Sequence, residues 1–319
     1  MFKALVLVRN IEPGAECLDF GEFTINRAGL QSEELKEVFS SQDVNEYDWI
    51  FEKSYAELPP GPLGSAVGGI PNDIEDILLL LRLYKAGDIA FIKQAVVQPS
   101  GKRSLQAPDR VMNDLNSYAA QRFEAKSEDC ALWGAFADTV RQSQSWSSAW
   151  FAAARRFFLT GGAKRFDLKS DDVDRIVDYA TALEAALVPE TDYNTQRISR
   201  RAAALIVPDD PAQAEVITRF IKRFYGIRSR IVHGSGLGDK ERQWLSDNYV
   251  EIERRVREIL VAAVQKLLPG EQDRKVALAG LYDLTDAERG NSALEKFKKI
   301  ETAEVRTAIA AKIAELARE

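Results

Sequence analysis

The spacing of hydrophobic residues divides the chain into two parts. In roughly the first 100 residues, short apolar runs alternate with Gly and Pro, as in strands joined by turns. These runs predict strands over residues 4–8, 22–25, 48–51 and 90–97, together with a helix over residues 73–85. From about residue 129 onward, apolar positions recur at helical spacing and glycines become rare, which predicts long amphipathic helices.

Three of these helices have recognisable beginnings or ends. Ser170 is placed to cap a first helix that ends before Pro189, and the aspartates of its first turn suit the positive end of the helix dipole. Asp210 is a candidate N-cap for a second helix, which Gly234 would end. A third helix is predicted over residues 239–268, because a Pro-Gly pair follows it. The expected apolar stripe of the second helix is Val216, Ile217, Phe220, Phe224, Ile227 and Ile231.

The change of pattern sets the expected domain organisation. Residues 1–125 are expected to form an α+β domain, residues 126–268 an all-α helical bundle, and residues 269–319 a helical extension. Five aromatic residues near the start of the helical part are interpreted as core side chains rather than as a platform for stacking nucleic-acid bases. They are Trp133, Trp146, Trp150, Phe157 and Phe158.

Composition excludes several classes of protein. The chain has 319 residues, of which 45% are hydrophobic and 29% charged, so it is too apolar for wholesale disorder. Its single histidine excludes any metal site within one chain that needs two imidazoles, and its two cysteines fit a reducing cytoplasm. The glycines between residues 58 and 71 match neither a dinucleotide-binding fingerprint nor a P-loop. Because the apolar runs are too short for a signal peptide or a membrane span, we expect a cytoplasmic protein without membrane contact, metal or cofactor.

The only histidine, His233, lies in the most informative segment of the sequence, residues 224–234. It follows Arg228 by five positions, near the end of the predicted second helix. Taken alone, this spacing is a weak signal, because a histidine in the last turn of a helix also interacts favourably with the helix dipole. A purely structural role for His233 therefore stays open at this point.

A longer stretch, from Ala149 to Gly234, resembles the HEPN superfamily and in particular its Apea-like branch. Several blocks agree with that family in order and spacing, and the last of them contains the Arg and the His. The blocks are Arg156-Phe157, Asp174-Arg175-Ile176-Val177-Asp178, Ala182-Leu183-Glu184-Ala185-Ala186-Leu187, Arg201-Ala202-Ala203 and Tyr225-x-x-Arg228-Ser229-x-x-Val232-His233-Gly234. The resemblance covers little more than a quarter of the chain and does not extend to residues 1–125.

The resemblance implies a HEPN-type helical bundle that forms a homodimer and cleaves RNA without a metal ion, as many members do in toxin or phage-defence systems. By position, it assigns the catalytic pair to Arg228 and His233, with Ser229 at the adjoining polar position. The wider superfamily often has Asn, Asp or His at that polar position. One toxin branch has Tyr two residues after the His, where this chain has Ser235, so neutralisation by nucleotide transfer to such a Tyr is not expected.

Helical geometry places a constraint on this pair. Residues five positions apart differ by about 140° around an α-helix, so Arg228 and His233 cannot share one face of a straight helix. Two copies of the helix that meet across a two-fold axis would bring the two residue types together. In such a dimer, an imidazole can remove the 2′-hydroxyl proton of RNA while a guanidinium stabilises the phosphate, which yields a 2′,3′-cyclic phosphate.

The segment around the pair is basic although the chain is acidic. Residues 197–230 contain eight basic and three acidic side chains, a net charge of +5 in a chain whose net charge is −6. A local basic surface is sufficient for binding the phosphates of a nucleic acid. The expected RNA-binding residues are Arg219, Lys222, Arg223 and Arg230.

Two functions are compatible with these patterns. The first is a homodimeric HEPN-type endoribonuclease, in which the N-terminal domain senses a trigger, contacts a partner or selects the substrate. The alternative is a non-catalytic HEPN dimer that binds RNA, nucleotides or a partner protein. The sequence favours the enzyme, because both polar residues of the motif are present among neighbours that resemble the family.

Overall fold

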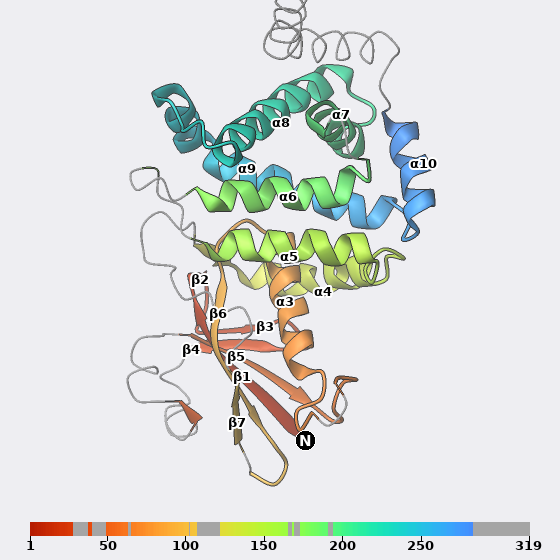
Figure 1. The fold of residues 1–319 in the computed structure, drawn as a ribbon. Helices are drawn as coiled ribbons and strands as arrows, with labels where there is room; N and C mark the ends of the chain where they lie inside the picture. The colour runs from red at the N-terminus through yellow and green to blue at the C-terminus, as the bar shows by residue number, and fades with distance from the viewer. Residues whose placement is uncertain are drawn as a thin grey trace, which may run out of the picture.

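The structure of the chain, a computed structural model, describes residues 1–27, 38–39, 49–62, 65–101, 103–106, 122–164, 168, 173–190 and 194–282. Within these residues, a sheet-bearing N-terminal part is followed by a helical part, as Figure 1 shows. The strands are β1 (Phe2–Arg9), β2 (Ile11–Pro13), β3 (Cys17–Asp19), β4 (Thr24–Arg27), β5 (Trp49–Tyr55), β6 (Ala90–Val97), β7 (Arg103–Gln106) and β8 (Phe123–Ala125). The helices are α3 (Ile70–Tyr84), α4 (Ser127–Arg141), α5 (Ala149–Ala163), α6 (Asp174–Leu187), α7 (Asn194–Ile206), α8 (Pro211–Val232), α9 (Asp239–Lys266) and α10 (Glu271–Leu281).

The N-terminal part is built around a six-stranded antiparallel sheet with the strand order β3-β4-β5-β1-β6-β7. The central strand, β1, pairs with β5 on one side and with β6 on the other. All residues from Ala4 to Val8 are buried, so this strand lacks the alternation of a half-exposed strand and neither of its faces meets solvent. A separate parallel pair, β2 with β8, brings the chain just before α4 back to the end of β1.

The helix α3 connects the sheet to the helical part. Its buried residues surround the helix instead of following a single stripe, which is typical of a helix covered on all sides. Figure 1 shows α3 beside the sheet, with its C-terminal end at α4 and α5. The end of α3 is therefore a place where the two parts of the molecule meet.

The remaining helices lie in successive layers beyond the sheet (Figure 1). α4 and α5 come first, α5 packs against α6, and both α6 and α7 contact α9. α7 and α8 pack as a pair on the side of the bundle away from the sheet, and α10 contacts α7. The rest of the expected C-terminal extension, after residue 282, lies outside the described residues.

Most of the predicted elements are confirmed with shifted ends. The strands expected over residues 4–8, 22–25, 48–51 and 90–97 correspond to β1, β4, β5 and β6, and the helix over residues 73–85 corresponds to α3. The long helices predicted for the second part correspond to α6, α8 and α9. An α+β part followed by helices is therefore the architecture of the described residues.

Two details of the predicted helices are wrong. α6 begins at Asp174 with Val173 at its N-cap, whereas Ser170, the predicted cap, lies outside the described residues. Val216, which is expected in the apolar stripe of α8, is 55% exposed. The buried stripe of that helix begins one position later, at Ile217. Adjacent residues differ by about 100° around a helix, so Val216 and Ile217 lie on different sides of α8.

The aromatic residues at the start of the helical part belong to the core, as predicted. Trp133, Trp150 and Phe158 are buried, and Trp146 and Phe157 pack against the same core while partly exposed. The Trp133 ring meets two phenylalanine rings of the N-terminal part edge-on, at centroid distances of 5.0 and 5.8 Å. This tryptophan is therefore packed between α4 and the sheet-bearing part, where no base can stack on it.

A buried ionic network joins the sheet-bearing part to the helices. Arg175 of α6 donates through Nη1 to both carboxylate oxygens of Asp88, at 2.9 and 3.0 Å, and both side chains are buried. Arg82 of α3 donates to the carbonyls of Leu159 and Gly162 at the end of α5, at 3.4 and 3.2 Å. Nη2 of Arg175 donates to the Gly162 carbonyl as well, at 3.2 Å. Two arginines from different elements therefore satisfy the C-terminal end of α5, where the helix dipole favours positive charge.

A second carboxylate completes this network. Glu253 of α9 is 3% exposed, and its Oε1 accepts the backbone N–H of Gly87 at 3.3 Å. Burial raises the pKa of Glu253, and the nearby Asp88 raises it further. A Cβ atom on Gly162 would collide with the Arg82 guanidinium, so any other residue there would force this side chain to shift. The network contains two arginines and two carboxylates, and buried charges are tolerated only when they are compensated in this way.

Arg175→Met is expected to destabilise the protein by about 3–5 kcal/mol, because it leaves the buried Asp88 carboxylate without its cation. Urea denaturation of the purified variants measures the change. The double variant Arg175→Met/Asp88→Asn removes both charges and should recover part of the loss. Arg200→Met is the matched control, because it breaks an exposed ion pair with Glu215 and should change stability by less than about 1 kcal/mol. Equal effects of the two arginine substitutions would contradict this assignment.

Candidate active site

The helix α8 carries the residues that the sequence assigns to catalysis and RNA binding. Asp210 caps its start and accepts the backbone N–H of Gln213 at 2.9 Å, as predicted. At the other end, His233 is the C-cap and Gly234 adopts a φ of +66°. The N–H groups of Gly234 and Ser235 donate to carbonyls of the last turn, which forms a Schellman motif. His233 therefore lies at the point where the helix stops.

α6, which packs against α8, is held at its C-terminal end by two arginines. Arg201 of α7 donates to the Leu187 carbonyl at 2.8 Å, and Arg274 of α10 donates to the Ala185 carbonyl at 2.6 Å. Carbonyls at this end of a helix have no partner within the helix, and they favour a cation. These contacts fix the turn of α6 that carries Glu184.

Some arginines of the basic segment, residues 197–230, form ion pairs inside the protein and are not available to bind RNA. Arg201 forms two hydrogen bonds with Glu190, at 2.8 and 2.9 Å, and Arg197 pairs with the same carboxylate at 2.9 Å. Partial burial raises the pKa of Glu190, but these arginines outweigh it and bring the pKa down to about 2. Arg197 and Arg201 are buried. The net charge of +5 over residues 197–230 therefore does not form one continuous basic surface.

Arg228 lies between α8 and α6 and not on the open surface. Its Nη2 pairs with Oε2 of Glu184 at 3.1 Å, and its side chain is 19% exposed. Tyr225, nearly one turn earlier on α8, donates its hydroxyl to the other carboxylate oxygen of Glu184. The Arg228 guanidinium also lies 5.3 Å from the centre of the Tyr225 ring, within cation–π range. A carboxylate and an aromatic ring thus orient Arg228.

The surroundings of Tyr225 and Arg228 determine which of their groups donate hydrogen bonds. Burial and the hydrogen bond to Glu184 raise the pKa of Tyr225 to about 12, so the phenol keeps its proton at neutral pH and acts as a donor. Within the described residues, the hydrogen bonds of the Arg228 side chain are confined to Nη2, and its buried Nε has no partner. The guanidinium therefore retains donors for a ligand.

His233 lies on a different side of α8 from Arg228. The two positions differ by about 140° around the helix, and whereas Arg228 faces α6, His233 is exposed. Ser229, the adjoining polar residue, is partly buried, and its carbonyl accepts the backbone N–H of His233 at 3.1 Å. The structure therefore does not bring Arg228 and His233 together within one chain, in agreement with the helical geometry.

His233 shares its side of α8 with the residues expected to bind RNA. Arg219, Arg223, Arg230 and His233 follow one another at intervals of four, seven and three positions, which places them along one face of a helix. Lys222 lies at the edge of that face, and all five side chains belong to exposed residues. We call these five residues the basic ridge.

The cations of the basic ridge are only weakly engaged. Arg230 pairs with Glu241 at 2.9 Å, and Arg219 lies 3.8 Å from a carboxylate one turn earlier. The Arg223 guanidinium lies 5.1 Å from the centre of the Trp244 ring. Exposed ion pairs of this kind contribute only about 0–1 kcal/mol, so contacts to phosphate can replace them.

Glu184 and Tyr225 are the site residues that sequence reasoning did not assign. Both lie in blocks that resemble the HEPN family, but no role follows from their positions in the sequence. The available signal was the single carboxylate of Glu184 in a block of alanines and leucines, because a charged group among apolar residues needs a partner. The identity of that partner depends on how α6 packs against α8.

Further comparisons concern metal sites, membranes and known proteins. In the described part of the chain, no group of three or more His, Cys, Asp or Glu side chains is placed to hold a metal ion. Among the helices described there, none is long and apolar enough to cross a membrane. The chain matches no family model, no curated protein and no solved structure. Any functional assignment therefore depends on the residues described above.

Substitution of two glycines of this region by alanine is expected to change the stability of the protein in opposite directions. Gly226 lies in the interior of α8, where a Cβ would meet open space, so Gly226→Ala should stabilise the protein by up to about 1 kcal/mol. Gly234→Ala should destabilise it by about 1–2 kcal/mol, because alanine is strained at a φ of +66°. Urea unfolding of both variants at low protein concentration measures these changes. A destabilising Gly226→Ala would indicate that another chain or segment lies against this face.

Proposed function

We propose that this protein is a metal-independent endoribonuclease of the HEPN type that acts as a homodimer. Its substrate is RNA, and its catalytic residues are Arg228 and His233, with Ser229 beside them. The N-terminal part, residues 1–125, would sense a trigger or select the substrate in a cytoplasmic toxin or phage-defence system.

The proposal is supported above all by the division of the functional groups between two sides of α8. Glu184 and Tyr225 orient Arg228 on the side that faces α6. His233 lies on the exposed basic ridge, together with four cations that suit an RNA backbone. A second copy of the chain, related by a two-fold axis, can place its Arg228 beside the His233 of the first copy. One imidazole per chain then provides two in the dimer.

The chemistry of such a site is a transesterification within the RNA strand. The His233 imidazole removes the proton of a 2′-hydroxyl, and the oxygen attacks the adjacent phosphorus. The bond between phosphorus and the 5′-oxygen breaks, and this oxygen takes a proton from the second imidazole of the dimer or from water. The products are a 2′,3′-cyclic phosphate and a 5′-hydroxyl end. Arg228 stabilises the negative charge that develops on the phosphate oxygens.

Glu184 acts as a positioning residue in this scheme. Its carboxylate holds the Arg228 guanidinium through one nitrogen, so the remaining donors stay available for phosphate. The Tyr225 hydroxyl occupies the other carboxylate oxygen and keeps Glu184 in one orientation. A guanidinium that is oriented before RNA binds loses less side-chain entropy when the phosphate arrives.

A non-catalytic dimer that binds RNA, nucleotides or a partner protein is the second candidate. The ion pair between Arg228 and Glu184 favours it, because this pair joins α6 to α8 and gives Arg228 a purely structural role. The position of His233 at the end of α8 gives this residue a structural role as well, since a helix C-terminus favours a cation. In that case the basic ridge binds a ligand and nothing is cleaved.

Purified wild-type protein is expected to cleave RNA, and Arg228→Ala and His233→Ala should each lower the rate by at least about 100-fold. The reaction should proceed at the same rate in excess EDTA, because neither acid–base catalysis nor charge stabilisation here uses a metal. Gel electrophoresis follows the cleavage, and mass spectrometry identifies the 2′,3′-cyclic phosphate ends.

Lys275→Ala is the matched control for these substitutions. It removes a cation that pairs with Glu271 at 2.8 Å on α10, away from the site, and it should cleave RNA at the wild-type rate. Activity that vanishes with EDTA and returns with Mg²⁺ would contradict the metal-independent mechanism. If His233→Ala cleaves as fast as wild type, or wild type cleaves no RNA under any trigger tried, the binding module is the better description.

The composite site also predicts that two inactive variants restore activity when their chains are combined. In a heterodimer of Arg228→Ala and His233→Ala chains, the first chain supplies the imidazole and the second supplies the guanidinium. Subunit exchange followed by an RNA cleavage assay should therefore recover activity that neither variant has alone. Native mass spectrometry verifies that heterodimers form. If they form without recovery, a composite site made of one Arg228 and one His233 is wrong, and the reaction either needs both imidazoles or uses the two groups of one chain.

A further inference from the structure

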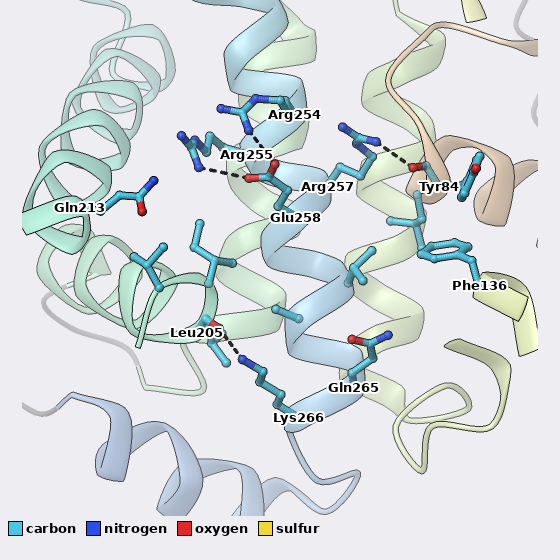
Figure 2. A pocket seen from close by; sticks show the side chains of 15 residues that line it. Tyr84, Phe136, Leu205, Gln213, Arg254, Arg255, Arg257, Glu258, Gln265 and Lys266 are labelled. Atoms are coloured by element: carbon cyan, nitrogen blue, oxygen red, sulfur yellow. Dashed lines mark hydrogen bonds and ion pairs between the residues drawn. The ribbon is translucent and has the colours of Figure 1, made fainter. Parts of the chain in front are cut away.

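A groove lies where the end of α3 meets the helical part, apart from the basic ridge. It has a volume of about 630 Å³, and its floor is a face of α9. One wall consists of the end of α3 and of Phe136 from α4, and the other of the end of α7 and the start of α8 (Figure 2). This volume falls within the range of small-molecule sites, about 300–1,000 Å³.

The floor of the groove has an apolar centre between two polar ends. Val261 and Ala262 lie on α9 between Glu258 and Lys266, and Phe136 adds an aromatic ring from the wall. Figure 2 shows three arginines and Glu258 at one end of the groove, and Lys266 at the other. Such a lining can bury an apolar body and bind a charged group at the same time.

Two of the arginines are compensated within the chain. Arg254 and Arg255 each pair with both Glu251 and Glu258, and these contacts include distances of 2.7 Å for Arg254 to Glu258 and for Arg255 to Glu251. Two arginines and two glutamates are formally neutral together. This cluster therefore contributes little net charge to the groove.

Arg257 and Lys266 differ from Arg254 and Arg255 because their hydrogen bonds go to backbone carbonyls and not to carboxylates. Nη1 of Arg257 donates to the Tyr84 carbonyl at the end of α3, at 3.0 Å, and Nζ of Lys266 donates to the Leu205 carbonyl in the last turn of α7, at 2.7 Å. A helix C-terminus favours a cation but supplies only about half a negative charge. Nε of Arg257 is buried without a partner among the described residues. Burial lowers the pKa of Arg257, and the neighbouring glutamates offset only part of this decrease.

We propose that this groove binds a small organic phosphate, with its phosphate at Arg257 and its apolar or aromatic body over Val261 and Ala262. A phosphate monoester carries nearly two negative charges at neutral pH. The Arg257 guanidinium faces this charge directly, and Lys266 adds a second positive charge at the other end of the groove. The planar guanidinium offers the paired donors that phosphate oxygens accept. The apolar centre adds burial of the organic body, which inorganic phosphate lacks. The bound molecule would contact α3 and α9 together, and this inference does not depend on RNA cleavage.

Isothermal titration calorimetry with 1-naphthyl phosphate, which combines both features, tests the proposal. One saturable site per chain is expected. Inorganic phosphate lacks the aromatic body and 1-naphthol lacks the charge, so each should bind at least about tenfold more weakly. The proposal is overturned if 1-naphthyl phosphate does not bind, or if 1-naphthol binds as tightly.

Two substitutions locate the bound molecule. Arg257→Met removes the cation and should weaken binding at least about tenfold. Gln265→Glu places a negative charge on the floor at nearly constant size, but at the end of the groove away from Arg257, so it should weaken binding by a smaller factor. Gln243→Glu, the same substitution at an exposed position near the start of α9, is the matched control and should bind as wild type does. Thermal unfolding shows whether Arg257→Met, which also loses its contact with the end of α3, is folded. A folded Arg257→Met variant that binds 1-naphthyl phosphate as tightly as wild type would place the ligand elsewhere and overturn the proposal.

Discussion

Two buried arginines hold the sheet-bearing part and the helical part of this protein in one arrangement. Arg82 and Arg175 come from α3 and α6, and both reach the last carbonyls of α5, while Arg175 also binds Asp88. A buried guanidinium is tolerated only when its charge is matched and its N–H groups have acceptors, so four elements must meet in one geometry. Hydrophobic packing alone would allow these elements to slide by small amounts, because apolar contacts have no direction. The network thus fixes the start of α6 relative to the sheet.

The candidate site depends on that position of α6. Arg175 holds its beginning, and Arg201 and Arg274 hold its end, so the turn that carries Glu184 has little freedom. Glu184 in turn orients Arg228, which makes this half of the site pre-organised within one chain. The other half differs in kind, because His233 lies at the exposed end of α8, and its hydrogen bonds to other described residues are made by the backbone. A site of this type becomes complete only when another chain or a ligand approaches that end.

The features that depend on local periodicity could be predicted from the sequence, whereas those that depend on contacts between distant residues could not. The strands of the central sheet and the long helices follow from apolar spacing, and the cap at Asp210 and the stop at Gly234 follow from local backbone chemistry. The beginning of α6 was not predictable, because a Ser followed by aspartates is a strong cap signal in the sequence, whereas the N-cap of this helix is Val173. Arg197 and Arg201 look like surface arginines in the sequence, and only the packing of α7 against α6 shows that they are buried. The geometry of Arg228 and His233 was predictable from helical rotation, whereas the contact with Glu184 required the fold.

The helix α9 links these places physically. Glu241, near its start, pairs with Arg230 of the basic ridge, Glu253 in its middle belongs to the buried network, and its last turns form the floor of the groove. A helix of 28 residues is about 42 Å long and moves nearly as one body. A molecule in the groove can influence the ridge through the start of α8, which forms one wall of the groove, or by shifting α9 against α6. A shift of α9 that leaves a buried charge unpaired costs about 3–5 kcal/mol. A ligand moves this equilibrium only by its difference in affinity for the two arrangements. The free energy needed to break the buried network is consequently the cost that any trigger acting through the N-terminal part must overcome by its binding.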